Sequence, residues 1–500
     1  MKTSHQFSVA IGDRLELPVE KLLFRGVGLG RWRGMAVMVP RSAPGDLLRV
    51  RVTAVRRDYL EAEIEEVLSS SPERSLPFCP DYPCCGGCQW QHLTLEGQRK
   101  WKELILAELL RPLSRGGEVS VSCLFPVSPP RGYRTRAQVK VGEEGNRVRL
   151  GFFRPRSHIL VEIDTCPLLD SHLDALLTSL REMRYPDLKQ LFPRLKEVRF
   201  QKGFPEGKIL LTLVTPTASR PSLRLLYHRL KEASFNLAGI ALAWGMGPTV
   251  HDHVGDGWTE VWVGGIGLRV GPTSFCQVGE QGAEAILRII QDWMEPRGIA
   301  SLLDLYCGVG TFCLPFAARG VKTVGVESCA EAASLAKSNA ERNGIRGVKI
   351  MHSSAEEALS EGWRHEKYDL VLVDPPRPGI SKRAMQGLLS LSPRHLIYIS
   401  CDPSTLCRDM LILQEAGYQY REIQPLDLFP HTYHLETVVW MEKKESKPMR
   451  KLVGRGKGKG ALATGSGLSL DNSASPDDII PPIPAAPPNL PFSMAEESWR

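Results

Sequence analysis

The sequence lacks any long hydrophobic run, and this absence excludes a helical membrane protein. None of its 500 residues lies in an uninterrupted apolar stretch of the roughly 18 to 20 residues that a membrane-spanning helix needs. The first segment, MKTSHQFSVAIGDRLELPVE, also lacks the apolar core of a secretory signal peptide. We therefore expect a soluble, cytoplasmic protein with no membrane partner.

A strong charge of one sign is missing as well. The formal net charge of +7 permits a polyanionic partner such as RNA without requiring one. The 12 cysteines do not predict disulfides, because thiols stay reduced in the cytoplasm. Each cysteine is therefore a packing residue, a ligand or a nucleophile.

The length and the changes of pattern along the chain predict three folded domains and a tail. Residues 8–70 contain short β-branched runs separated by glycine-rich turns, which predict an OB-like β-barrel whose arginines suit RNA. Residues 75–270 mix helices and hairpins, as in an α+β domain. Residues 271–442 alternate strand and helix, which predicts an α/β domain with a doubly wound, largely parallel sheet. Residues 443–500 have the composition of a disordered tail.

Strand ends in the alternating domain carry the signs of a cofactor site. DLYCGVGTF follows an apolar strand, and its Gly308 and Gly310 let the backbone approach a ligand. Glu327 ends the next strand, where an acidic residue can bind a ribose diol. The third glycine of the G-x-G-x-x-G pattern is missing, which argues against a dinucleotide and favours S-adenosylmethionine. Asp374 ends a further strand, and the carboxyl ends of parallel strands meet at one crevice.

Cys401 stands at a fourth strand end, in the run SCDPSTLCRD. Taken alone it is more typical of a packing residue, because free cysteine is among the most buried residue types. Beside a cofactor crevice it becomes a candidate nucleophile, and a polar strand-end setting predicts a lowered pKa for its thiol. The second cysteine of the run, Cys407, keeps the packing interpretation.

Six motifs in a fixed order carry a family resemblance: SFCQVG, DLYCGVGTF, GVE, DPPRPG, YISCDPSTLCRD and DLFPHTYHLE. Over residues 8–441 the chain resembles the bacterial RNA uracil-5-methyltransferases, which use S-adenosylmethionine to make 5-methyluridine in 23S ribosomal RNA or tRNA. The resemblance implies a TRAM domain for the barrel and a Rossmann-like methyltransferase fold for the alternating domain. It also implies roles for six residues, with Cys401 as nucleophile, Glu436 as general base, and cofactor contacts by Gln277, Tyr306, Glu327 and Asp374.

The chemistry of uracil explains why one thiol and one carboxyl suffice. C5 becomes a good nucleophile once a thiolate has added at C6, and a base must later remove the C5 proton so that the cysteine can leave. The uridine must also be flipped out of the RNA structure to reach the crevice. The chain departs from the family at Cys276, Gly279 and Thr311, which lie near the expected methyl donor.

A cluster of cysteines predicts a second cofactor. CPDYPCCGGC places Cys79, Cys85 and Cys88 in a C-x5-C-x2-C arrangement, with Cys84 as an extra and Cys166 far downstream. Four thiolates suit either zinc or an iron–sulfur cluster, and the residues alone leave both open. The family resemblance favours a 4Fe-4S cluster held by Cys79, Cys85, Cys88 and Cys166, with a structural or RNA-facing role.

Several alternatives share part of this pattern. A base N-methyltransferase needs no cysteine nucleophile, and a cytosine-5-methyltransferase shares the thiolate but fits the Glu436 motif less well. A non-catalytic iron–sulfur RNA-binding protein explains the barrel and cluster but leaves Cys401 and Glu436 without purpose. The barrel and the cluster together favour 23S rRNA over a tRNA substrate of the uridine-54 type, and no feature implies an obligate protein partner.

Overall fold

The computed structural model describes most of the chain: residues 9–114, 119–144, 147–183, 195–216, 223–245, 249–274, 277, 279, 281–360 and 367–444. The described residues belong to one unit, Met1–Lys444. The expected disordered tail lies almost entirely outside the described residues, as does Cys276.

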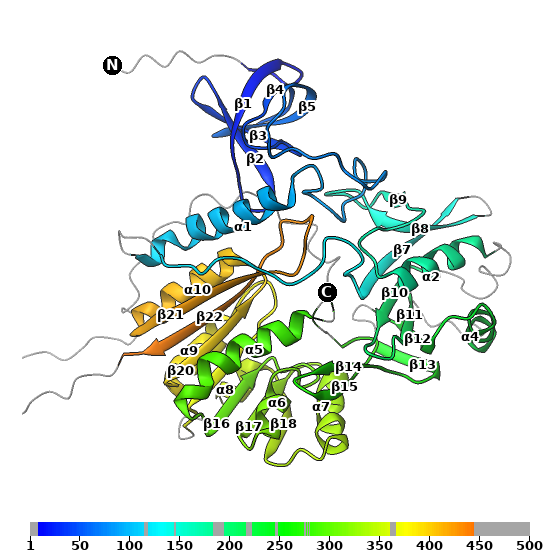
Figure 1. The fold of residues 1–500 in the computed structure, drawn as a ribbon, viewed down its shortest axis with the longest axis vertical. Coiled ribbons are helices and arrows are strands. Elements are labelled where there is room, and N and C mark those ends of the chain that lie inside the picture. The colour runs from blue at the N-terminus through cyan, green and yellow to red at the C-terminus, as the bar shows by residue number, and fades with distance from the viewer. Residues whose placement is uncertain are drawn as a thin grey trace, which may run out of the picture. The chain divides into compact units, whose positions relative to one another are not determined.

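The N-terminal barrel is closed, with strand order β1-β2-β3-β5-β4 (Figure 1). Its strands are β1 (Arg14–Leu22), β2 (Val27–Trp32), β3 (Met35–Pro40), β4 (Leu47–Val55) and β5 (Tyr59–Ser69). Side chains alternate along β1, so that Leu15, Leu17 and Val19 fill the interior. The predicted OB-like barrel is confirmed, but several of its arginines pair with glutamates on neighbouring strands, as Arg49 does with Glu16 at 3.1 Å.

The central α+β region is built on a seven-stranded sheet of order β13-β12-β11-β10-β7-β8-β9. The strands are β7 (Arg136–Glu144), β8 (Arg147–Phe153), β9 (Leu160–Glu162), β10 (Glu197–Lys202), β11 (Ile209–Thr215), β12 (Leu237–Trp244) and β13 (Thr249–Gly255). The helices α2 (Ser171–Glu182) and α4 (Leu223–Glu232) pack on it through leucines at helical spacing.

The second large sheet has eight strands in the order β18-β17-β16-β19-β20-β22-β21-β6. They are β6 (Phe125–Pro126), β16 (Ser301–Leu305), β17 (Lys322–Glu327), β18 (Val348–His352), β19 (Leu370–Val373), β20 (His395–Ser400), β21 (Tyr418–Asp427) and β22 (Glu436–Lys443). The first five strands in this order are parallel, whereas β22 runs antiparallel to both β20 and β21. A two-stranded hairpin, β14 (Thr259–Val263) and β15 (Ile266–Val270), precedes β16 in the chain.

Helices cover both faces of the eight-stranded sheet, as a doubly wound fold requires (Figure 1). One core joins Leu302 and Leu372 to α5 (Gly282–Met294), α6 (Cys313–Ala318) and α7 (Ala330–Arg342). The other face joins alternate strand residues to α8 (Ala355–Ser360), α9 (Lys382–Leu391) and α10 (Pro403–Glu415).

One segment from before the central sheet also packs on the eight-stranded sheet. The helix α1 (Leu95–Leu110), followed by the turn η1 (Arg111–Ser114), contributes Leu106 and Leu110 to the second of these cores. Strand β6 then pairs with β21 at the sheet edge. Residues that the sequence placed in the central domain therefore complete the alternating one.

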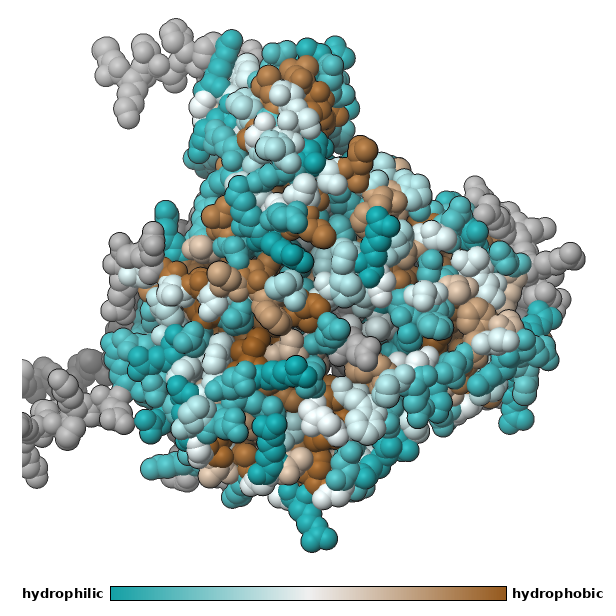
Figure 2. All heavy atoms as spheres, in the orientation of Figure 1, coloured by the Kyte–Doolittle hydropathy of each residue, from teal (hydrophilic) through white to brown (hydrophobic). Residues whose placement is uncertain are grey.

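The visible surface is mostly hydrophilic, with hydrophobic residues in scattered patches (Figure 2). Among the described residues, no helix has the length and apolarity to cross a membrane.

Candidate active site and cysteine pocket

The crevice forms where the order of strands reverses. The chain passes from β16 outward to β17 and β18, and then returns to the other side of β16 with β19 and β20. In such sheets ligands bind beyond the carboxyl ends of the strands on either side of this point. The segments after β16, β17, β19 and β20 carry the predicted site residues.

The glycine-rich loop after β16 is tied to the end of β17. Tyr306 and Gly308 both have positive φ, of 68° and 57°, which turns the chain sharply at the strand end. The Gly308 N–H donates to Glu327 Oε2 at 3.0 Å, and the Cys329 N–H donates to Glu327 Oε1 at 2.6 Å. The Glu327 carboxylate is thus held against the loop, in the place expected for a ribose-binding group.

Two more carboxyls belong to neighbouring strands: Asp304 lies in β16, and Asp374 directly follows β19. Gln277 Nε2 donates to Asp374 Oδ2 at 3.3 Å, so two of the predicted cofactor residues are in contact. Burial raises the pKa of Asp374 to about 7. Asp304, the fourth residue of β16, is fully buried, and neither of its carboxylate oxygens has a hydrogen-bond partner in the described residues. Burial and then the charge of Asp374 hold the pKa of Asp304 well above its usual value.

Asp304 is a candidate site residue that the sequence reasoning did not single out. The sequence did contain a sign of it: Asp304 is a carboxyl inside the apolar strand SLLDL, and burying a carboxyl there costs stability, which is typical of a functional residue.

The pairing of β20 with β22 brings Cys401 and Glu436 together. Ser400, the last residue of β20, pairs with Thr437 in antiparallel register. Cys401, which follows Ser400, therefore lies opposite Glu436, the first residue of β22. Glu436 is buried, and Cys401 is half-buried. The two residues are 35 positions apart in the sequence, and the antiparallel return of the chain explains why they lie at one place.

The expected direction of the Cys401 pKa shift is wrong. Burial, followed by the charge of Glu436, raises the pKa of the thiol to about 12, and the charge of Arg377 opposes this rise. Burial and then Asp374 likewise hold the pKa of Glu436 well above its usual value, again opposed by Arg377. Neighbouring segments bury the end of β20, and the effect of this burial on the pKa of the thiol is larger than the effect of the nearby polar groups.

The helix after Cys401 fixes the loop that bears Arg377. Asp402 caps α10 by accepting from the Ser404 N–H at 2.9 Å. Thr405 Oγ1 donates to the Arg377 carbonyl at 3.0 Å, and Asp409 Oδ2 accepts from the Ile380 N–H at 2.8 Å. Cys407 packs in the core beneath this helix, in agreement with its interpretation as a packing residue.

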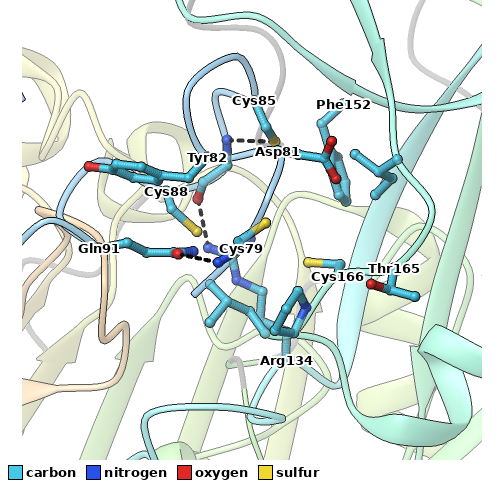
Figure 3. Close-up of a pocket in the computed structure, with 14 residues that line it drawn as sticks. Cys79, Asp81, Tyr82, Cys85, Cys88, Gln91, Arg134, Phe152, Thr165 and Cys166 are labelled. Atoms are coloured by element: carbon cyan, nitrogen blue, oxygen red, sulfur yellow. Dashed lines mark hydrogen bonds between the residues drawn. The ribbon is translucent and has the colours of Figure 1, made fainter. Parts of the chain in front are cut away.

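The four predicted ligand cysteines line one pocket, together with the buried Arg134 (Figure 3). Cys79, Cys85 and Cys88 come from the loop before α1, and Cys166 follows β9. Cys84 is exposed and does not line the pocket.

The pocket keeps its thiols protonated when nothing is bound to them. Burial raises the pKa of Cys85 to about 12 and that of Cys88 to about 11. The Gly87 N–H donates to Cys85 Sγ at 3.4 Å, and Arg134 Nη2 donates to the Gly87 carbonyl at 3.1 Å. Within the described ranges, no three His, Cys, Asp or Glu side chains converge closely enough to hold a single metal ion.

The sheet is doubly wound, with a glycine-rich loop after β16, an acidic residue at the end of β17 and a thiol beside a carboxyl. Together these features fit a Rossmann-like methyltransferase. The family model for tRNA (uracil-5-)-methyltransferases matches residues 98–444, and that for the TRAM domain matches residues 9–64. The chain belongs to this family of S-adenosylmethionine-dependent RNA (uracil-5-)-methyltransferases, as the motifs predicted.

Similar proteins agree with the family over most of the chain. The 23S rRNA (uracil(1939)-C(5))-methyltransferase RlmD of Aeromonas hydrophila is 33% identical over 443 residues, which cover 86% of this chain and 97% of that protein. An uncharacterised RNA methyltransferase of Thermosynechococcus vestitus is also 33% identical, over 85% of this chain and 97% of its own length. The crystal structure of Pyrococcus abyssi tRNA (uracil-54, C5)-methyltransferase with S-adenosyl-L-homocysteine has a TM-score of 0.66 and 26% identity, and covers 85% of this chain and 100% of that one.

Proposed function

We propose that this enzyme methylates C5 of a uridine in 23S ribosomal RNA, with Cys401 as nucleophile and Glu436 as general base. The observation that carries the proposal is the pairing of β20 with β22, which puts this thiol and this carboxyl side by side at the crevice. A carboxyl beside a nucleophilic thiol is the minimum set that the reaction needs.

The thiolate of Cys401 adds to C6 of the uracil, and the C5=C6 electron pair moves toward O4, which makes C5 enolate-like. S-adenosylmethionine would supply the methyl group on its sulfonium: the methyl–sulfur bond would break as the bond to C5 forms, and its electron pair would stay on the sulfur of S-adenosylhomocysteine. C5 then carries both the methyl group and its original hydrogen. The Glu436 carboxylate takes that hydrogen as a proton, the C5=C6 bond re-forms, and the bond from C6 to Cys401 breaks.

Cofactor binding is assigned to the residues around the glycine-rich loop. Glu327 would hold the ribose diol, with its carboxylate already oriented by the Gly308 N–H. The other proposed contacts are Gln277, Tyr306 and Asp374.

The choice of 23S rRNA rests on the similarity to the Aeromonas enzyme and on the presence of both the barrel and the cysteine pocket. A tRNA uridine of the 54 type is the second candidate, because the Pyrococcus enzyme acts on such a substrate and shares the fold. In either RNA the target base must leave its stack to reach Cys401.

The substrate is tested by mapping 5-methyluridine in 23S rRNA and tRNA from cells with and without the gene. We expect one 23S rRNA site to lose its methyl group when the gene is deleted, and to regain it when purified enzyme and labelled S-adenosylmethionine are added. Loss confined to tRNA would overturn the choice of substrate.

The nucleophile is tested by Cys401→Ala in the same assay. Methyl transfer should fall to background while S-adenosylmethionine still binds with an unchanged dissociation constant, because the thiol is not a cofactor contact. Cys407→Ala is the matched control and should stay active, since Cys407 lies in the core. Full activity of Cys401→Ala would contradict the assignment.

We further propose that Cys79, Cys85, Cys88 and Cys166 hold a 4Fe-4S cluster. Four partly buried thiols around one pocket fit a cluster that takes one thiolate per iron, whereas a lone zinc needs all its ligands at about 2.3 Å from one point. The Gly87 N–H toward Cys85 Sγ is the kind of hydrogen bond that stabilises a cluster sulfur. The chain's thiols must lose their protons on binding, which the buried charge of Arg134 favours at Cys88.

Two neighbouring cysteines provide the test of the cluster. Protein purified without oxygen should contain iron and sulfide and absorb visible light. Cys85→Ala should lose both iron and colour, whereas Cys84→Ala should keep them, because Cys84 is exposed outside the pocket. A colourless protein with one bound zinc would contradict the proposal.

A further inference from the structure

The loop of residues 428–435, between β21 and β22, leads directly into Glu436 and is held from outside its own sheet. Four consecutive backbone carbonyls accept hydrogen bonds from distant segments of the chain. The pairs are Ser128 Oγ to Leu428 O at 3.0 Å, Lys102 Nζ to Phe429 O at 3.0 Å, Tyr133 Oη to Pro430 O at 3.1 Å, and the N–H groups of Gln89 and Trp90 to His431 O at 3.1 and 3.0 Å. Each of these four peptides is therefore hydrogen-bonded to a segment outside the loop.

Gln98, on α1, is the centre of this arrangement. Its side chain is fully buried, and its Oε1 accepts from the His431 N–H at 2.7 Å. Its Nε2 lies 3.0 Å from the carbonyls of Trp90 and Leu93 and 3.1 Å from His431 Nδ1. One amide side chain therefore joins the loop to the segment that precedes α1.

His431 needs such support because its backbone has φ of 67°, a left-handed conformation that costs a non-glycine residue about 1 kcal/mol or more. Burial lowers the pKa of His431 to about 4, so the ring is neutral and its Nδ1 can accept from Gln98. The strained residue lies five positions before Glu436.

The same contacts reach the cysteine pocket. Gln89 and Trp90, which donate to the His431 carbonyl, follow Cys88 without a break. Cys88 lines the pocket, so the backbone between the pocket and the loop is continuous. Gln98 therefore contacts both the loop and the segment that follows the cysteine pocket.

We propose that Gln98 is a positioning residue for methyl transfer, which fixes the 428–435 loop so that Glu436 lies where it can take the C5 proton. The inference rests on the proposed role of Glu436. It assigns a function in the proton-removal step to a glutamine whose side chain is fully buried.

The test is Gln98→Leu, which keeps the size of the side chain and removes all of its hydrogen bonds. Misplaced Glu436 removes the proton slowly, so the Cys401–RNA adduct should build up as a covalent species on a denaturing gel. We expect kcat to fall about 10- to 100-fold, as for a catalytic group displaced by about 1 Å, with unchanged affinity for S-adenosylmethionine. Gln98→Glu, which in its protonated form keeps an acceptor for the His431 N–H, should show a smaller fall and less adduct.

Three comparisons make the outcomes distinct. Gln414→Leu removes a glutamine hydrogen bond, to the Leu113 carbonyl at 3.0 Å, near the far end of α1 and should turn over normally without adduct. Glu436→Gln should trap the adduct, and if it does not, the proposed base fails whatever Gln98 does. If Glu436→Gln traps adduct while Gln98→Leu shows none, or shows wild-type kcat, the positioning role is overturned.

Discussion

Buried carboxyl groups set the character of the site at the scale of single residues. Asp304, Asp374 and Glu436 all have pKa values raised by burial. A carboxyl whose pKa is raised in the fold weakens folding at any pH where the unfolded chain would ionise it. These carboxyls therefore lower the stability of the fold, and their pKa values can be measured from the pH dependence of the free energy of unfolding.

Asp374→Asn should stabilise the protein at pH 8 while weakening cofactor binding. The pKa of this carboxyl is near 3.8 in the unfolded chain and about 7 in the fold, so the penalty is absent below pH 4 and complete above pH 7. We expect a gain of about 4 kcal/mol in the free energy of unfolding at pH 8 that vanishes at pH 4, because each unit of pKa shift is worth about 1.4 kcal/mol. Urea denaturation at the two pH values measures it, and an equal gain at both would contradict the raised pKa.

Arg377→Met should slow methyl transfer near neutral pH. The guanidinium charge lowers the pKa of Cys401 against burial and Glu436, and without it the thiolate becomes rarer by about tenfold per pKa unit. We expect kcat/KM at pH 7.5 to fall at least about tenfold, with part of the loss recovered at higher pH. The alkylation rate of Cys401 against pH, followed by mass spectrometry, should shift upward in parallel. Arg383→Met, on the exposed side of α9, should leave both profiles unchanged.

At the scale of secondary structure, α1 and α10 brace the two loops of the site. Thr405 and Asp409 of α10 hold the Arg377 loop, and Gln98 and Lys102 of α1 hold the 428–435 loop. The sequence predicted a helix at α1 but not at α10, and it could not show what α1 packs against. Gln98 and Lys102 look like solvent-facing residues until a segment more than 300 positions later covers them.

Lys102→Met should destabilise the fold strongly. Lys102 Nζ lies 2.7 Å from Asp427 Oδ1 and both side chains are 1% exposed, so removing the amine leaves a buried carboxylate without its main partner. We expect a loss of about 3–5 kcal/mol in the free energy of unfolding, measured by urea denaturation. Lys100→Met is the matched control. Its pair with Glu73 is 57% exposed on the lysine side, and the change should cost about 1 kcal/mol or less.

At the scale of the whole molecule, the sequence predicted which residues lie at the ends of strands, but it did not predict how deeply the surrounding segments bury them. Each of Glu327, Asp374 and Cys401 follows an apolar run, and parallel strands must bring such positions to one edge. The pKa of Cys401 depends instead on how many segments surround it, which composition does not reveal. The position of Cys166 in one pocket with Cys79, Cys85 and Cys88 could not be derived from the residues either. Only the family resemblance implied it, because the fold of the intervening sheet decides whether distant thiols meet.

The packing of α1 against α10 has a consequence for how the protein is made. Gln414 bonds to Leu113 across a separation of 301 residues, and Leu106 and Leu110 share a core with Leu406 and Met410. Ribosomes add about 5–20 residues per second, so the apolar face of α1 leaves the exit tunnel roughly 15–60 s before its partner exists. During that interval the nascent chain displays a leucine-rich helix with nothing to cover it. We expect chaperone occupancy on translating ribosomes to begin as α1 emerges and to end only after α10 has been synthesised, a pattern that ribosome profiling of chaperone-bound nascent chains would reveal.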